Sequence, residues 1–349
     1  MSAAAAPALP PWLAVQLKRL LAQRGHAWLL QGPSGLGQAE LGLALVRAWL
    51  CEQPGEEGAC GHCASCHAID VHTHADLAVL MPETELLARG WPLSEKAQAD
   101  IDDKKRKPSQ DIRVEALREA IEFAQRTSAR GRGLAVLIYP AERMNTVAAN
   151  ALLKTLEEPP GDVRFVLASD AAHALPATIR SRCQAHTLAW PEPAQAQRWL
   201  VDQGLSAPDA AVLLRAAGGR PADALSLAQT LGAQPAAAWA ALPKAFARGE
   251  GAAALAGQPL GWAIGVLQKL CHDLLAQTSG AAPRFFDAAD LPPVPRGPAA
   301  VEALTAWAAE LRQAARTADH PFQPGLALEA QAARALKALH FAPPPASRP

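Results

Sequence analysis

The fold is decided by the stretch Leu134–Pro160, which reads LAVLIYPAERMNTVAANALLKTLEEPP. Its first five residues form an apolar run with β-branched side chains and no polar interruption, which predicts a buried parallel strand. The second half carries apolar residues at helical spacing, namely Ala149, Leu152, Leu153 and Leu156, and it ends at the pair Pro159-Pro160. The stretch therefore predicts a strand followed by a helix, in an α/β fold.

The residues directly after this strand are Tyr139 and Pro140. A nucleotide hydrolase places carboxylates at this point, where they hold a metal ion and polarise water. Neither side chain can do that work. The strand and helix look like part of an ATPase scaffold from which the acidic residues needed for hydrolysis are missing.

A second motif is the loop GPSGLGQA at residues 32–39, between a predicted strand at 27–30 and a predicted helix at 40–50. Gly32, Gly35 and Gly37 have the spacing of a P-loop, in which backbone N–H groups and a helix N-terminus point at phosphate oxygens. However, Gln38 replaces the lysine that would contact phosphate, and Ala39 replaces the hydroxyl that would ligate magnesium. We therefore expect no ATP here and interpret the loop as a turn kept for its shape.

Four of the six cysteines lie close together in sequence, at Cys51, Cys60, Cys63 and Cys66. Two short C-x2-C steps have the spacing of a tetrahedral zinc site, and four sulfur ligands leave no open position for catalysis. The pattern predicts a structural zinc ion. The alternatives are four free or oxidised thiols, or a site in which His62 or His67 replaces one cysteine.

Composition excludes several classes of protein. The formal net charge is zero, so no global field favours nucleic acid as a bulk partner, and half of the residues are hydrophobic, enough for more than one core. The N-terminus lacks a basic segment, and no apolar run approaches the roughly 20 residues that span a membrane. We expect a soluble, cytoplasmic protein of two or three domains with no membrane partner.

Between the two motifs, residues 82–108 read as a polar and irregular insertion that ends in the run DDKKRKP at 102–108. The basic run is either a DNA contact or, as we expect, part of a solvated and mobile loop. Further along, a buried strand is predicted at 163–168 with Ser169 at its end, and TIRSRCQ follows at 178–184. The arginines of that segment, Arg180 and Arg182, either act elsewhere or pair with nearby carboxylates.

The C-terminal half is mostly helical in pattern. A break at Trp190-Pro191-Glu192-Pro193 precedes an Ala/Leu-rich helical segment at 194–232, and long helices are predicted at 260–277 and 301–316. Val301, Leu304, Ala308 and Leu311 mark the apolar side of the second of these. A proline-rich loop is predicted at 281–298, and a last helix at 320–339.

The order of these elements, with NALLKTLEEPP at 150–160 and SRC at 181–183, resembles the clamp-loader branch of the AAA+ ATPases. The likeness covers nearly the whole chain. It implies an α/β RecA-like AAA+ domain with a parallel sheet at 1–190 that carries a zinc module at about 51–66. It also implies a small helical lid domain at 191–232 and an all-α C-terminal collar domain for oligomerisation at 233–349.

The resemblance also implies site residues and a role. In catalytic relatives the SRC arginine, here Arg182, reaches in trans to a neighbour's ATP as an arginine finger, and the four cysteines match the family's zinc ligands. The lid arginine of a working site corresponds to Ala222, with Arg220 nearby but out of register. The implied protein is not an enzyme in its own right. It is a rigid, non-hydrolytic stator of a bacterial DNA polymerase III clamp loader.

Its implied partners are ATPase subunits of the gamma or tau type and a delta subunit, and, through the complex, the sliding clamp and primed DNA during replication. Two other classes remain open from the residues alone. One is an ATP-binding AAA+ ATPase with an atypical P-loop, and the other is a zinc-bearing nucleic-acid-binding module.

Overall fold

The computed structural model describes residues 9–293, 297–318 and 323–339. The chain forms two compact units, and the division lies between Gln195 and Ala196. In these described ranges, no helix has the length and apolar character needed to cross a bilayer. Each unit has its own core and is described separately.

The N-terminal unit is built on one five-stranded parallel sheet with the order β2-β3-β4-β1-β5. Its strands are β1 (Ala27–Gln31), β2 (Leu77–Leu80), β3 (Leu134–Ile138), β4 (Val163–Ser169) and β5 (Gln184–Thr187). All residues of β3 are buried, as expected for a central strand covered on both faces. The predicted α/β fold with a parallel sheet is confirmed.

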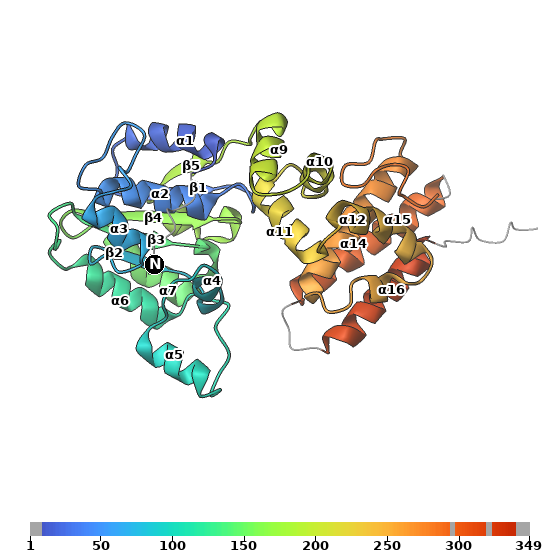
Figure 1. The fold of residues 1–349 in the computed structure, drawn as a ribbon. Coiled ribbons are helices and arrows are strands. Elements are labelled where there is room, and N and C mark those ends of the chain that lie inside the picture. The colour runs from blue at the N-terminus through green and yellow to red at the C-terminus, as the bar shows by residue number, and fades with distance from the viewer. Residues whose placement is uncertain (1–8, 294–296, 319–322, 340–349) are drawn as a thin grey trace, which may run out of the picture. The chain divides into compact units, whose positions relative to one another are not determined.

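Helices cover both faces of the sheet (Figure 1). α6 (Val114–Ala124) and α7 (Thr146–Glu157) share a hydrophobic core with one face, and α2 (Gln38–Leu50) packs on the other with α1 (Pro11–Leu21) outside it. A Cβ on Gly42 of α2 would lie 2.8 Å from Leu137 Cδ1, so this glycine lets α2 approach β3 closely. The helix predicted after Leu134–Ile138 is confirmed as α7.

The insertion at 82–108 is more ordered than the sequence predicts. It contains α4 (Glu83–Ala88) and α5 (Glu95–Asp102), so the expectation of irregular structure is wrong. No residue of α5 is buried, which explains why the sequence carries only a weak apolar pattern there. The basic run is anchored, because Arg106 donates to the buried carboxylate of Glu83 at 2.9 Å.

Four short helical elements complete the described N-terminal unit. α3 (Ala64–Asp70) follows α2 in the cysteine-rich segment, and α8 (Ala177–Arg180) precedes β5. A single turn of 3-10 helix, Ala141–Arg143, leads from β3 toward α7, and another, Ala172–Ala174, follows β4. These turns bring polar side chains to the carboxyl ends of the central strands.

All regular elements in the described residues of the C-terminal unit are helices. They are α9 (Pro193–Asp202, which begins in the first unit), α10 (Ala207–Ala216), α11 (Pro221–Leu231), α12 (Pro235–Ala247), α13 (Gly251–Ala254), α14 (Leu260–Thr278), α15 (Pro298–Arg316) and α16 (Pro324–Leu339). The predicted helix at 260–277 is confirmed. For the last helix, predicted from His320, residues 320–322 lie outside the described part of the chain.

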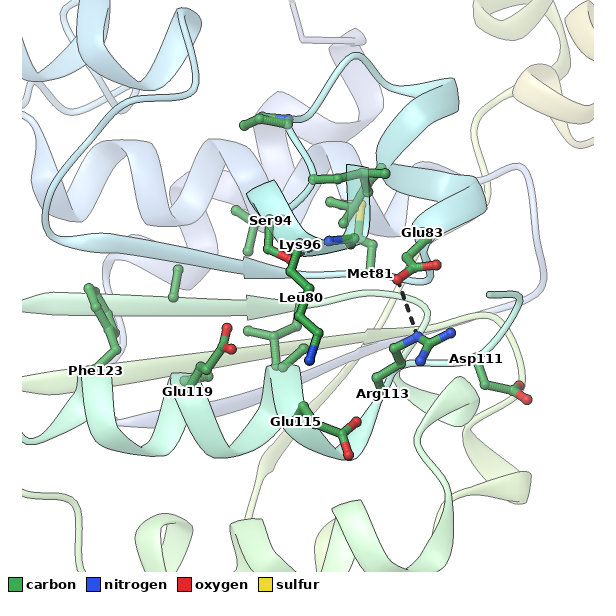
Figure 2. A pocket seen from close by; sticks show the side chains of 18 of the residues that line it. Leu80, Met81, Glu83, Ser94, Lys96, Asp111, Arg113, Glu115, Glu119 and Phe123 are labelled. Carbon is green, nitrogen blue, oxygen red and sulfur yellow. Dashed lines mark hydrogen bonds and ion pairs between the residues drawn. The ribbon is translucent and has the colours of Figure 1, made fainter. Parts of the chain in front are cut away.

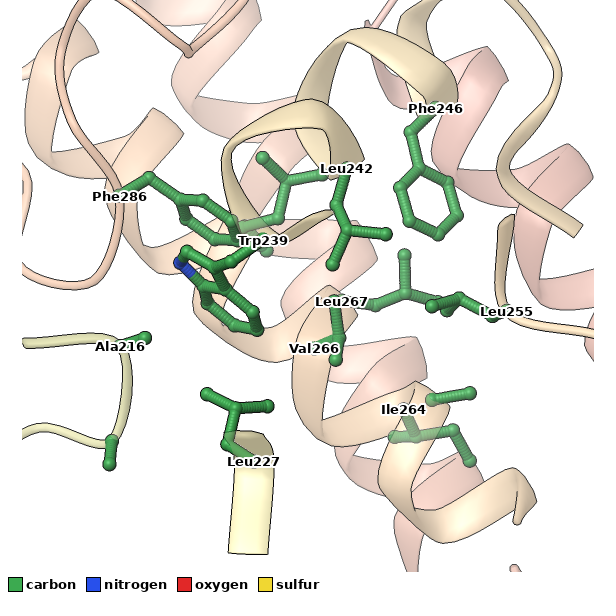
Figure 3. Packing of buried hydrophobic residues seen from close by; sticks show 14 of the residues in the cluster. Ala216, Leu227, Trp239, Leu242, Phe246, Leu255, Ile264, Val266, Leu267 and Phe286 are labelled. Carbon is green, nitrogen blue, oxygen red and sulfur yellow. The ribbon is translucent and has the colours of Figure 1, made fainter. Parts of the chain in front are cut away.

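Large side chains from distant segments form the core of this unit (Figure 3). Trp239 of α12 stacks on Phe286, which comes from the proline-rich loop, with ring centroids 4.5 Å apart. Trp307 is buried on α15, whereas Val301 is 37% exposed, so its place in the predicted apolar side of that helix is wrong. The loop thus contributes to the core, and its backbone is held as well: the buried Asp273 carboxylate accepts the N–H groups of Arg284, Phe285 and Phe286.

A second buried carboxylate fixes the start of β2. Asp76 is 1% exposed and accepts the backbone N–H groups of Ala129 and Arg130 at 2.7 and 2.9 Å and the Ser128 hydroxyl at 3.0 Å. Burial alone would raise the pKa of Asp76, but these three donors outweigh it, so the pKa lies below its ordinary value. The ionised form therefore stabilises the folded unit.

Asp76→Asn is expected to lower the free energy of unfolding of the N-terminal unit by about 2 kcal/mol at pH 7, because a charged acceptor of several donors is lost. Since the folded pKa is depressed, the difference from the parent chain should shrink as the pH falls through that value. Urea unfolding at pH 7 and pH 3 measures both effects. Asp103→Asn, at an exposed pair with Lys105, is the control and should change stability by less than about 0.5 kcal/mol.

Candidate functional site

The glycine loop is occupied by its own glutamine side chain. Gln38 begins α2 and is 2% exposed. Its Nε2 donates to the carbonyls of Gly32 and Pro33, each at 2.8 Å, and its Oε1 accepts the N–H of Gly37 at 3.1 Å. The loop is thus closed by hydrogen bonds within itself, and one N–H that would face a phosphate is already bonded.

The rest of the loop is held from outside. Trp12 Nε1 donates to the Leu36 carbonyl at 3.1 Å, and Ala39 is buried. Gly37 has a left-handed backbone with φ 105°, and a Cβ there would lie 2.5 Å from Leu13 Cδ1. The structure therefore brings the predicted P-loop residues together in a tight strand-to-helix turn whose shape depends on glycine.

At the carboxyl ends of β3 and β4, polar side chains bond to one another. The Tyr139 hydroxyl donates to Asp170 Oδ2 at 3.1 Å, and burial is the main cause that raises the pKa of Tyr139 above its usual value. The Ser169 hydroxyl donates to Glu142 Oε2 at 2.6 Å, and Glu142 Oε1 accepts the Asp170 N–H at 3.1 Å. Tyr139 and Ser169 lie where the sequence predicts, and two unpredicted carboxylates partner them.

An arginine from the insertion reaches this region. Arg89 Nη1 donates to Glu40 Oε1 at 2.9 Å, and its guanidinium carbon lies 5.0 Å from the centre of the Tyr139 ring. Burial opposes the charge of Arg89, but the Glu40 carboxylate outweighs it and raises the pKa of Arg89. Arg89 therefore stays charged and ties the insertion to the first turn of α2, the helix that follows the glycine loop.

Sequence reasoning missed Glu40, Arg89, Glu142 and Asp170. Glu142 could have been found most easily, because an acidic residue two positions after Pro140, just beyond a buried strand, indicates a polar group at the end of the sheet. Its carboxylate accepts hydrogen bonds from Ser169 and Asp170, so both of its oxygens are engaged within the protein. The side chains at these strand ends thus form a connected polar network, in which the Ser169 hydroxyl is already bonded to Glu142.

Arg182 lies just after α8, with its guanidinium on the carboxylate of Glu157 at the end of α7. Its Nε lies 2.7 Å from Glu157 Oε1, and its Nη1 donates to the Thr178 carbonyl at 2.8 Å. The side chain remains 29% exposed. The structure thus shows the local ion pair expected by the alternative interpretation of this arginine, and the role in trans stays a prediction.

The four predicted metal ligands meet in one cluster. The Sγ atoms of Cys51, Cys60, Cys63 and Cys66 all lie within 4.8 Å of one another. Cys51 ends α2, Cys63 caps the N-terminus of α3 and Cys66 lies in its first turn, so two helix ends position three of the thiols. None of the four thiols is paired in a disulfide.

The cluster fits a tetrahedral metal ion. Sγ–Sγ distances are 3.8 Å from Cys51 to both Cys63 and Cys66, and 4.0 Å from Cys60 to Cys66. Zinc bound at about 2.3 Å to four sulfurs requires sulfur separations of about 3.8 Å. Within the described residues the group contains these cysteines alone; His62 and His67 are not part of it. The donor set therefore suits zinc, and metal binding must displace protons from thiols such as Cys66, whose pKa burial raises to about 12.

The candidate lid residues lie in the C-terminal unit. Ala222 is exposed in the first turn of α11, and Arg220, which precedes that helix, lies 2.9 Å from Asp223. Arg220 is therefore engaged by a carboxylate of its own unit. The prediction that Arg220 is out of register with the nucleotide-contacting arginine of a working lid stays a prediction.

Comparison with known proteins gives one family. Residues 13–192, about half of the chain, match the family model described as DNA polymerase III, delta subunit. The chain is 38% identical over 208 residues to DNA polymerase III subunit delta' of Pseudomonas aeruginosa, which covers 59% of this chain and 56% of that protein. It is 36% identical over 225 residues to the delta' subunit of Escherichia coli, which covers 63% of this chain and 60% of that protein.

A third relative carries the name of another subunit of DNA polymerase III. The tau subunit of DNA polymerase III from Salmonella typhimurium is 33% identical over 158 residues, which is 45% of this chain and 21% of that protein. The chain therefore spans little more than half the length of the delta' subunits it matches and about a fifth of the tau subunit.

Proposed function

Because the chain belongs to the DNA polymerase III delta-subunit family and its curated relatives are delta' subunits, we propose that it is a non-hydrolytic subunit of a bacterial clamp loader. In this role it is a rigid stator that presents Arg182 to the ATP site of a neighbouring subunit. The work of the complex is to load the sliding clamp on primed DNA during replication.

The observation that carries this proposal is the occupation of the glycine loop by Gln38. A P-loop binds phosphate through free backbone N–H groups, a lysine and a hydroxyl that ligates magnesium. Here the Gln38 amide bonds to three backbone groups of the loop, and the hydroxyl position is the buried Ala39. Nucleotide would have to break these bonds and would gain neither the lysine contact nor the metal ligand.

The second support is the position of Arg182. Its guanidinium is partly exposed on a short turn after α8, where Glu157 and the Thr178 carbonyl fix its direction. An arginine held in this way is pre-organised to meet the developing charge on a phosphate of another subunit. Glu157 then acts as the positioning residue, which releases or shares the guanidinium when the neighbour docks.

The proposed role also implies a set of partner subunits and a division of the chain into domains. The neighbours are ATPase subunits of the gamma or tau type and a delta subunit, and the clamp and primed DNA are reached through the complex. We assign the AAA+ domain to 1–190, the helical lid to 191–232 and the collar to 233–349. A chain without a nucleotide of its own has no ligand that would give two conformations different free energies, which suits a stator.

The cysteine cluster is proposed to hold a structural zinc ion. Its sulfur separations suit four-sulfur coordination, and three thiols are buried, so Cys51, Cys60, Cys63 and Cys66 would hold the ion without a reactive position. A bound ion would lock the segment between α2 and α3.

The alternative of a zinc-bearing nucleic-acid-binding module rests on the cysteine cluster and on the basic run at 104–107. In the structure Arg106 pairs with Glu83 and Asp100, and Lys105 pairs with Asp103. Half of the positive charges of the run are therefore balanced within the insertion, which leaves little of the phosphate-binding surface that this alternative requires.

Equilibrium dialysis of the purified chain against magnesium-ATP is expected to show no binding at micromolar nucleotide, because the loop is closed by Gln38. A gamma- or tau-type ATPase subunit, dialysed in the same way, is the positive control. Micromolar binding of magnesium-ATP to this chain would contradict the proposal and favour the alternative, an ATP-binding AAA+ ATPase with an atypical P-loop.

A further inference from the structure

β2 is the edge strand of the sheet and leaves part of its backbone open. It pairs only with β3, where Asp76 and Leu80 carbonyls accept the N–H groups of Ala135 and Tyr139, each at 2.9 Å. Because hydrogen bonds alternate along a strand, the N–H and C=O of Val79 point away from β3. Within the described residues, neither group has a recorded partner. An open edge of this kind is a template for another strand.

A large groove lies along this edge (Figure 2). Its volume is about 850 Å³, whereas voids in packed protein interiors seldom exceed a water molecule. It is lined by Ala78–Leu80 of β2 and Met81 after that strand, and by Ala120 and Phe123 of α6. Leu93, which precedes α5, and Ala97 of α5 also line it. We call this space the β2 groove. Its lining includes both apolar and charged residues.

The insertion forms the outer wall of the β2 groove and is fixed at its base. The Glu83 carboxylate at the start of α4 binds Arg106, Arg113 and the N–H of Ser109, so the two ends of the insertion are joined. Arg106 and the Ser109 N–H lower the pKa of Glu83 despite its burial, and Arg113 adds to this. α5 lines the β2 groove together with the edge strand and buries no residue of its own. A helix in this position has an inner face for a further segment to cover.

The charge of the inner wall indicates what kind of segment fits. Glu115 and Glu119 lie one turn apart on α6, and both line the β2 groove (Figure 2). In the described part of the chain, no ion pair joins either carboxylate to a basic group within 4.0 Å. Lys96 and Arg126 also line the groove, whereas Arg106 and Arg113 are paired with Glu83. A basic side chain entering beside these carboxylates would find complementary charge.

We propose that the β2 groove binds an extended polypeptide segment of a partner protein, which adds to β2 as a sixth strand beneath α5. The open backbone groups of Val79 supply main-chain hydrogen bonds, and alternate apolar side chains of the segment face Leu80, Ala120 and Phe123. A lysine or arginine of the segment lies beside Glu115 and Glu119. This surface is separate from the glycine loop and from Arg182.

The open edge favours this occupant over others. A helical segment satisfies its own backbone and leaves the groups of Val79 without partners, and a small apolar ligand does the same. An extended chain alone meets the edge, the apolar floor and the acidic wall together. The insertion thereby gains a role as one wall of a peptide site.

The test begins with a displayed library of random heptapeptides, selected on the full purified chain. The expected peptides alternate apolar and polar residues and carry a lysine or arginine. The best one, made synthetically, should slow amide hydrogen exchange in residues 77–81 on binding. Peptides without this pattern, a bound peptide that is helical by circular dichroism, or a Val79 amide already protected in the free chain would each overturn the proposal.

Two matched variants localise the binding. Glu119→Lys should weaken binding of the synthetic peptide at least tenfold, whereas Glu122→Lys, on the same helix but outside the groove, should leave it unchanged. Val79→Pro removes the outward N–H at an edge position where proline is tolerated and should also weaken binding tenfold or more. Equal binding by the folded Glu119→Lys variant and its Glu122→Lys control would refute the assignment, whether or not Val79→Pro folds.

Discussion

In a reconstituted clamp loader, Arg182→Ala is expected to slow ATP hydrolysis about 10³-fold at the one site that adjoins this subunit. A guanidinium presented in trans stabilises charge on the transferred phosphoryl group, and its removal leaves that charge unbalanced in a site shielded from water. Hydrolysis at the other sites should continue. In a rapid-quench experiment with DNA and clamp present, the fast phase should therefore lose the contribution of one ATP per complex.

Arg180→Ala is the matched control for this result. Arg180 is the last residue of α8, lies two positions before Arg182 and is exposed. Its variant should keep the full fast phase. Native mass measurement must show that both variants assemble with the same subunits as the parent chain. A full fast phase in the Arg182→Ala complex would show that Arg182 does not act at the ATP site of the neighbouring subunit.

The second large effect concerns the cysteine cluster. Cys66→Ser should abolish zinc binding, because a buried ligand of a four-sulfur site is replaced by a hydroxyl that does not ionise at neutral pH. Structural zinc binding is worth about 10–16 kcal/mol in small zinc peptides at pH 7, and it is coupled to local folding. The measurement is zinc content per chain by atomic spectroscopy, with hydrogen exchange of residues 51–70, which should become unprotected.

Cys183→Ser controls for the loss of a thiol elsewhere. Cys183 is half-buried near β5 and does not belong to the cluster. Its variant should keep zinc and protection of residues 51–70. A Cys66→Ser chain that retains stoichiometric zinc, or a parent chain purified from zinc-containing medium without any, would show that the cluster is a group of packed thiols.

Local patterns allowed much of the N-terminal unit to be predicted. The predictions of β3 and α7 were correct, because a short apolar run and a helical spacing of apolar residues are both local patterns in the sequence. The meeting of the four cysteines was also predictable, since metal-ligand spacing is local. The same argument explains the failure at 82–108: α5 buries nothing, so its sequence carries no apolar signal.

The contacts that define the glycine loop and the strand ends could not be predicted. The position of Gln38 indicated a missing lysine, but not that its amide would bond to Gly32, Pro33 and Gly37. Arg89 reaches Glu40 across 49 residues of sequence, and Ser169 finds Glu142 across 27. Such pairings depend on which strands become neighbours, and no periodicity in a single sequence encodes that order.

The side chain inside the glycine loop has a consequence for the cell. Gln38 is covalently part of the chain, so its effective concentration at the loop does not vary with the concentration of any metabolite. We expect the shape of this subunit to be indifferent to the ratio of ATP to ADP in growing and starved bacteria. Whatever timing the assembled machine shows in response to cellular energy must then arise in its other subunits.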